Sequence, residues 1–145
     1  REETEARHRI RLDLYVRTVG VELRVLRRML ATEVLPAAVR WQGRMAGSCR
    51  AAAEVLGRDA PGLDGQRARL AEVAGLIERL AGLVAALEAD EEALAAAEPL
   101  RAAADLCADR IRPRMAETRA VADRLEQLVD RSEWTLPTCD EMLTL

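Results

Sequence analysis

The side chains best suited to metal chemistry lie in one acidic stretch, residues 88–98. It contains Glu88, Asp90, Glu91, Glu92 and Glu98, and carboxylate oxygens are the ligands that Mg²⁺ and Ca²⁺ prefer. A calcium-binding loop also needs a turn glycine and fixed ligand spacing, and this stretch has neither. Its acids spread around a helix, so we interpret them as a solvated helix face.

Other residue types that could do chemistry lack the partners that the chemistry needs. His8 is the only histidine and stands between Arg7 and Arg9, so we interpret it as a surface residue and not a metal ligand. A di-metal site of the ferritin type needs Glu-x-x-His pairs, which one histidine cannot supply. Ser48 and Cys49 have no candidate base to activate them. We therefore predict no catalytic, cofactor-binding or metal-binding residue in this chain.

Two glycines, Gly43 and Gly47, stand four residues apart. Their spacing is that of a helix face and not that of a phosphate-binding loop. Since glycine has no Cβ, we expect them to let a neighbouring helix approach closely.

The element that must organise the chain is a long amphipathic helix over residues 3–57. Apolar or small residues recur along it at steps of three or four: Leu12, Val16, Val19, Leu23, Leu26, Leu30, Val34, Ala38, Trp41, Met45, Cys49, Ala52 and Leu56. This is the helical period. It continues through Pro36, so we predict a kink there and not an end. Leu14, Val21 and Val25 widen the apolar face, which indicates contact on two sides.

Two further helices are predicted, over residues 65–97 and 99–131. The first carries a heptad seam made by Leu70, Val73, Ile77, Leu80, Val84 and Leu87, which is typical of helices that pack at a shallow angle. Pro113 should bend the second. The fold class is therefore all-α: an antiparallel bundle of three long helices over residues 1–131. Residues 132–145 form an extended docking tail that ends in a small helical turn.

The first helix should outreach the other two. At 1.5 Å per residue it would span about 80 Å, against about 50 Å for each of the others. Roughly its first 20 residues would then lack cover within the chain, and exposed apolar surface of that size marks an interface. The predicted interface residues are Leu12, Val16, Val19 and Leu23 of the helix and Trp134, Leu136, Met142 and Leu143 of the tail.

The charge is unevenly spread. The net charge is −3, but residues 1–50 hold 11 Arg against 6 acids and residues 51–145 hold 11 Arg against 19 acids. A basic first helix could bind nucleic acid or an anionic membrane, or it could lie against the chain's own acidic helices. We favour the second explanation, because exposed aromatics and groove-reading motifs are missing. No nucleic-acid or membrane partner is expected.

The cysteines indicate a reducing compartment. Cys49, Cys107 and Cys139 are odd in number and widely spaced, which favours small buried thiols over a disulfide framework. The charged first residues argue against a signal peptide, and no apolar run is long enough to span a membrane. We expect a cytoplasmic chain that is one part of a larger protein.

Three stretches in order resemble the C-terminal helical region of type III glutamine synthetases and their relatives. They are residues 9–42 with Leu35-Pro36-Ala37 and Arg40-Trp41-Gln42, residues 113–130 beginning Pro113-Arg114-Met115, and residues 134–143 beginning Trp134-Thr135-Leu136-Pro137-Thr138. Thr135 and Cys139 stand where that family usually has Pro and Tyr. None of these stretches is catalytic.

The resemblance implies a role without chemistry of its own. Members of that family make glutamine from glutamate, ammonia and ATP with divalent Mg or Mn ions, in ring-shaped homo-oligomers. Their active site would precede residue 1, so ATP and metal are implied only for the parent enzyme. The implied partners are a missing upstream catalytic domain, identical subunits, or both.

Three functions therefore remain open. The leading hypothesis is a non-catalytic helical module of a glutamine synthetase-like ligase, which serves assembly or positions the catalytic domain. The second is a free-standing helical module for self-association or protein–protein interaction. The third, less favoured, is a basic-helix nucleic-acid binder, which would lose affinity steeply with salt.

Overall fold

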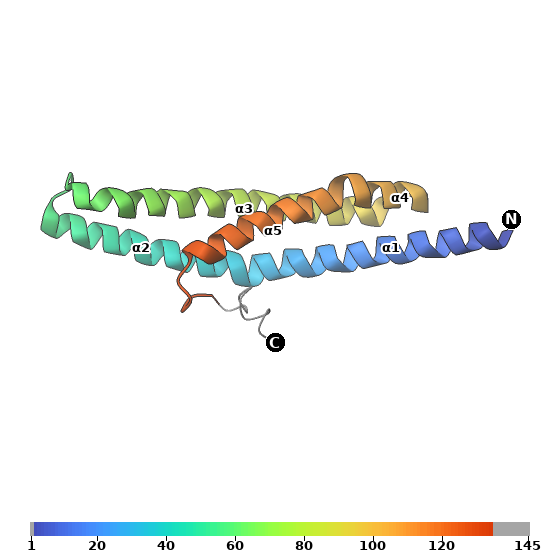
Figure 1. Cartoon of the computed structure of the whole chain (residues 1–145), viewed down its shortest axis with the longest axis horizontal. Helices are drawn as coiled ribbons and strands as arrows, with labels where there is room; N and C mark the ends of the chain where they lie inside the picture. Colours follow the sequence, from blue (N-terminus) through green and yellow to red (C-terminus); the bar gives the residue numbers. More distant parts are fainter. Residues whose placement is uncertain (1, 135–145) are drawn as a thin grey trace.

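The described part of the chain consists of three antiparallel helical rods. The computed structural model describes the backbone of residues 2–134 and the side chains of residues 3 and 5–134. Every regular element among these residues is helical, which confirms the predicted all-α three-helix bundle (Figure 1).

The rods are built from five α-helices and three short turns of other helical types. The first rod joins α1 (Glu2–Met29), the π-helical turn η1 (Leu30–Val34) and α2 (Leu35–Leu56). After a 3₁₀ turn, η2 (Pro61–Leu63), the second rod is α3 (Asp64–Ala96). The third rod joins α4 (Leu100–Leu106), the π-helical turn η3 (Cys107–Ile111) and α5 (Arg112–Leu128).

The core is built almost entirely from aliphatic side chains of medium size. Its largest fully buried apolar side chains are Leu23, Leu30, Leu63, Val73, Leu80, Leu87, Ile111 and Leu125. Each such side chain contributes about 1.5–3 kcal/mol through its removal from water. The core seam therefore holds the three rods together along most of α3.

Each proline-containing rod widens into a π-helical turn just before its proline. Pro36 lacks an N–H group, and its ring would collide with a carbonyl one turn earlier in an unbroken α-helix. The N–H of Leu35 donates to the carbonyl of Leu30, five residues back, and the N–H of Arg112 does the same to Cys107 ahead of Pro113. The extra residue per turn gives the proline ring room. The first rod bends where α1 meets α2 (Figure 1), as the sequence predicted.

The first rod projects past the other two at its N-terminal end (Figure 1). Residues 3 and 5–11 are all exposed, but Val19 is only 4% exposed and Val16 packs against the core. The prediction that the first 20 residues lack cover within the chain is therefore wrong for the second half of that stretch. The reason is that α4 packs beside α1 and extends the cover.

The glycines do not play the predicted part in helix packing. A Cβ added at Gly43 or Gly47 would meet nothing within 4 Å, so the expected close approach of a helix there is wrong. The close approach occurs at Gly20 of α1, where a Cβ would lie 3.4 Å from Leu94 Cδ2 of α3. Gly57 ends α2 with φ 94°, a backbone angle that side chains disfavour.

Gly57 should be the least replaceable glycine. Gly57→Ala is expected to lower the free energy of unfolding by about 1–2 kcal/mol, because φ is positive there. The matched change Gly43→Ala should raise it by about 0.5–1 kcal/mol, because alanine is the better helix former. Urea unfolding followed by circular dichroism measures both. Equal effects from the two changes would contradict the turn geometry.

Candidate functional site

The acidic stretch of α3 contains a buried carboxylate, although the sequence predicted that its acids are solvated. The side chain of Asp90 is 1% exposed. Its Oδ2 accepts a hydrogen bond from Arg114 Nη1 at 2.5 Å. Its Oδ1 lies 2.8 Å from Arg110 Nε but makes no aligned hydrogen bond, so this second contact is an ion pair only. Asp90 thus joins α3 to the third rod through two guanidinium groups.

The next residue makes the same kind of connection to the first rod. Glu91 Oε1 lies 3.1 Å from Arg24 Nε, and its Oε2 lies 2.9 Å from Arg27 Nε. Arg27 also lies 3.6 Å from Glu88. Adjacent residues of α3 therefore hold the two flanking rods, and we call Asp90, Glu91 and their four arginines the acidic clamp.

The prediction that residues 88–98 form a solvated face is wrong for Asp90. A buried charge is costly unless it is paired, and the arginines of η3 and α5 supply the pairing. A signal was present in the sequence, because Asp90 follows Leu76 and Leu83 at steps of seven and both leucines pack against the core. The basic first helix does lie against acids of α3, as the charge distribution suggested.

A second set of ion pairs holds the chain after α5. The helix ends at Leu128 because Val129 is extended, with φ −79° and ψ 138°. Glu133 then lies 3.0 Å from Arg40 Nε and 3.2 Å from Arg44 Nε, and Trp134 is 9% exposed.

The turn after α5 carries its own hydrogen bonds. The hydroxyl and the N–H of Ser132 both donate to Asp130 Oδ1. These bonds, with the nearby charge of Arg44, hold the pKa of Asp130 below its ordinary value. These bonds hold the turn together, and the ion pairs of Glu133 with Arg40 and Arg44 fix it on α2.

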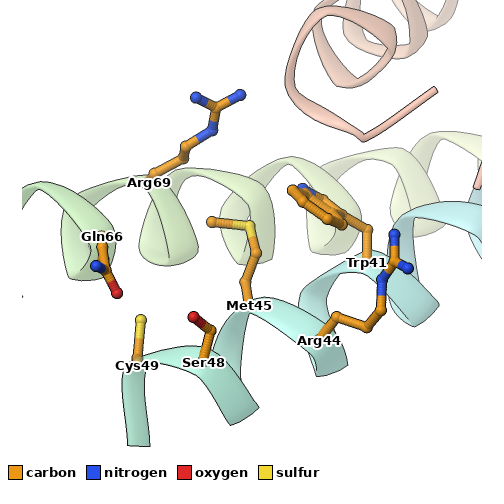
Figure 2. Close-up of a pocket in the computed structure, with 7 residues that line it drawn as sticks. All are labelled: Trp41, Arg44, Met45, Ser48, Cys49, Gln66 and Arg69. Atoms are coloured by element: carbon orange, nitrogen blue, oxygen red, sulfur yellow. The ribbon is translucent and has the colours of Figure 1, made fainter. Parts of the chain in front are cut away.

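A shallow pocket of about 350 Å³ lies on α2 and α3. Figure 2 shows Trp41, Met45 and Cys49 along α2, with Gln66 and Arg69 on α3. Both guanidinium groups that line it are engaged: Arg44 lies 5.1 Å from the centre of the Trp41 ring, and Arg69 Nη2 donates to the carbonyl of Leu128. The first contact lies within α2, and the second joins α3 to the end of α5.

The predicted interface residues fall into three groups in the structure. Leu12 and Val16 are half-buried. Val19 and Leu23 belong to the chain's own core, and Trp134 packs against it, so these three are already covered. Leu136, Met142 and Leu143 lie outside the described residues. The large apolar residues that the structure leaves open on α1 are five others: Ile10, Leu14, Val21 and Val25, which are the most exposed, and Met29, which is 36% exposed.

The described residues offer neither a metal-binding cluster nor a membrane-spanning helix. No group of three or more His, Cys, Asp or Glu side chains among them is arranged to hold a metal ion. Within residues 2–134, none of the helices combines the length and apolarity needed to cross a bilayer.

Comparison with known proteins gives a family match that is confined to the first rod. Residues 1–53 match the family model of the glutamine synthetase C-terminal domain. The match covers α1, η1 and most of α2, and it includes none of α3, α4 or α5. It supports a glutamine synthetase-like C-terminal region. No curated protein matches the chain.

Asp90 should contribute more to stability than the exposed acids near it. Asp90→Asn is expected to lower the free energy of unfolding by about 1–3 kcal/mol, because an amide cannot satisfy two guanidinium groups. Glu92→Gln, a matched change at an exposed position of α3, should stay within about 0.5 kcal/mol of the parent chain. Urea unfolding measures both. An Asp90→Asn chain as stable as the parent would contradict the clamp.

The two described cysteines should differ in reactivity. Cys107 is fully buried in the core, and burial raises the pKa of its thiol, so little thiolate forms at pH 8. Cys49 is partly exposed at the pocket. In the folded chain iodoacetamide should label Cys49 much faster than Cys107. Cleavage after arginine puts them in separate peptides for mass spectrometry. Equal rates are expected only in urea, and equal rates in buffer would contradict the burial of Cys107.

Proposed function

We propose that this chain is the non-catalytic C-terminal helical module of a glutamine synthetase-like ligase of type III. It serves subunit assembly or positions the catalytic domain. The observation that carries the proposal is the family match over residues 1–53. The ordered resemblance of residues 113–130 and 134–143 to type III members adds support.

The arrangement of the rods suits such a role. The matched segment is the first rod, which runs the length of the bundle and projects beyond the others (Figure 1). The acidic clamp fixes α1 through Arg24 and Arg27, while Glu133 fixes α2 through Arg40 and Arg44. The hairpin of α3 with α4 and α5 thereby stiffens the rod that contacts the rest of the enzyme.

The chemistry belongs to the parent enzyme in this proposal. ATP and Mg or Mn ions would bind in an upstream catalytic domain, and this chain contributes no ligand to them. Its partners are that domain, identical subunits, or both. The module acts in the cytoplasm and binds neither nucleic acid nor membrane.

The clamp offers a test in the full gene product. Reading the frame upstream of Arg1 should show a catalytic region of the glutamine synthetase type. In that product, Asp90→Asn with Glu91→Gln should lower the assembled fraction in sedimentation, because the first rod loses its brace. Glu78→Gln with Glu92→Gln, at exposed positions of the same helix, should not. An unchanged assembled fraction in the clamp variant would argue against the module.

The isolated 145-residue chain should form no glutamine from glutamate, ammonia and ATP with Mg²⁺. Measurable turnover, absent when the chain is omitted, would overturn the proposal.

A free-standing module for self-association is the second candidate. The exposed apolar residues of α1 favour it. An upstream frame without a catalytic region would select this candidate over the first.

A further inference from the structure

The helix α1 has a second apolar face that the bundle does not use. Ile10, Leu14, Val21 and Val25, which we call the outer stripe, are 67%, 64%, 58% and 59% exposed. At about 100° per residue they lie about 200° around the helix from the face of Val19, Leu23 and Leu26. Four large apolar side chains in line on one exposed helix face mark an interaction surface.

The helix α1 cannot turn about its own axis to bury the outer stripe against the bundle. The opposite face is buried in the core, with Leu23 0% and Leu26 5% exposed. Arg24 and Arg27 are paired with Glu91 of α3, and the Gly20 backbone lies against Leu94. Covering the outer stripe therefore requires another molecule or another segment on that side.

The spacing of the outer stripe is symmetric along the helix. Its successive steps are four, seven and four residues, from Ile10 to Leu14, Val21 and Val25. A second α1 that runs antiparallel, with a twofold axis between residues 17 and 18, sets Ile10 against Val25 and Leu14 against Val21. In a twofold interface each contact occurs twice. The spacing allows this, because both pairs of residues are centred on the same point of the helix.

The charges beside the outer stripe fit the same arrangement. Arg11 and Glu22 lie along one border, and no ion pair within the described residues engages either. In the antiparallel arrangement Arg11 of one copy lies near Glu22 of the other, and the pair occurs twice. On the opposite border Arg17 is neutralised by Asp13 at 2.8 Å and Arg24 by Glu91, which limits repulsion between copies.

We propose that a second copy of this chain docks antiparallel on the outer stripe of α1. The dimer buries Ile10, Leu14, Val21 and Val25 of both copies and is flanked by two Arg11–Glu22 ion pairs. The inference deepens the self-association that the proposed function includes, because it names the surface and the register. It needs no catalytic domain, so a monomeric chain would overturn the dimer without touching the family match.

Sedimentation of the 145-residue chain over a range of concentrations tests the surface. The parent chain should show a reversible monomer–dimer equilibrium. Leu14→Gln with Val21→Gln should raise the dimer dissociation constant at least about tenfold. Val55→Gln with Leu56→Gln makes the same kind of change at residues that are 84% and 61% exposed at the far end of α2, and it should leave the constant unchanged. Circular dichroism checks that all chains are folded.

Charge reversal tests the antiparallel register. Arg11→Glu should weaken the dimer about three- to tenfold, since two favourable pairs become repulsive. Adding Glu22→Arg should restore the parent value. A chain that stays monomeric at every concentration, a dimer that tolerates the outer-stripe change, or a double reversal without recovery would each overturn the proposal.

Discussion

The buried carboxylate of Asp90 is the constraint on which the arrangement of the rods depends. A seam of Leu, Val and Ala offers many registers of similar packing energy, because these side chains differ little in shape. A buried charge favours one register, because it is stable only where both of its guanidinium partners lie next to it. Asp90 meets Arg110 and Arg114 in one alignment of α3 with the third rod. We interpret the pair chiefly as a device that selects this register.

The two prolines act at equivalent places in the first and third rods. Each follows a π-helical turn that begins six residues earlier, from 30 to 36 and from 107 to 113. Both turns begin and end on core residues: Leu30 and Val34 in the first rod, Cys107 and Ile111 in the third. The extra residue in each turn rotates the following helix relative to the preceding one. Both rods can therefore keep a buried face on either side of a residue that would otherwise break the helix.

The family match and the electrostatics divide the bundle in the same way. The first rod contains the matched residues, and the other two rods contribute the acids of the clamp and of the turn after α5 that hold it. Rim charges that are partly exposed contribute little energy each. Together they restrict α1 and α2 at several points along their length. A stiff rod with one face buried and the opposite face apolar is suited to assembly with further protein.

The sequence by itself determined the helical class, the three rods and the bends at Pro36 and Pro113, because apolar periodicity and proline chemistry act locally. It also indicated pairing between the basic first helix and the acidic later ones. It did not determine which acid is buried, which glycine is closely packed, or which face of α1 stays open. Gly20 and Gly43 look alike in the sequence, and only the steps of seven from Leu76 and Leu83 distinguish Asp90 from Glu92. Only the rotation and offset of the rods decide which of each pair meets a neighbour, and those depend on all three rods packing together.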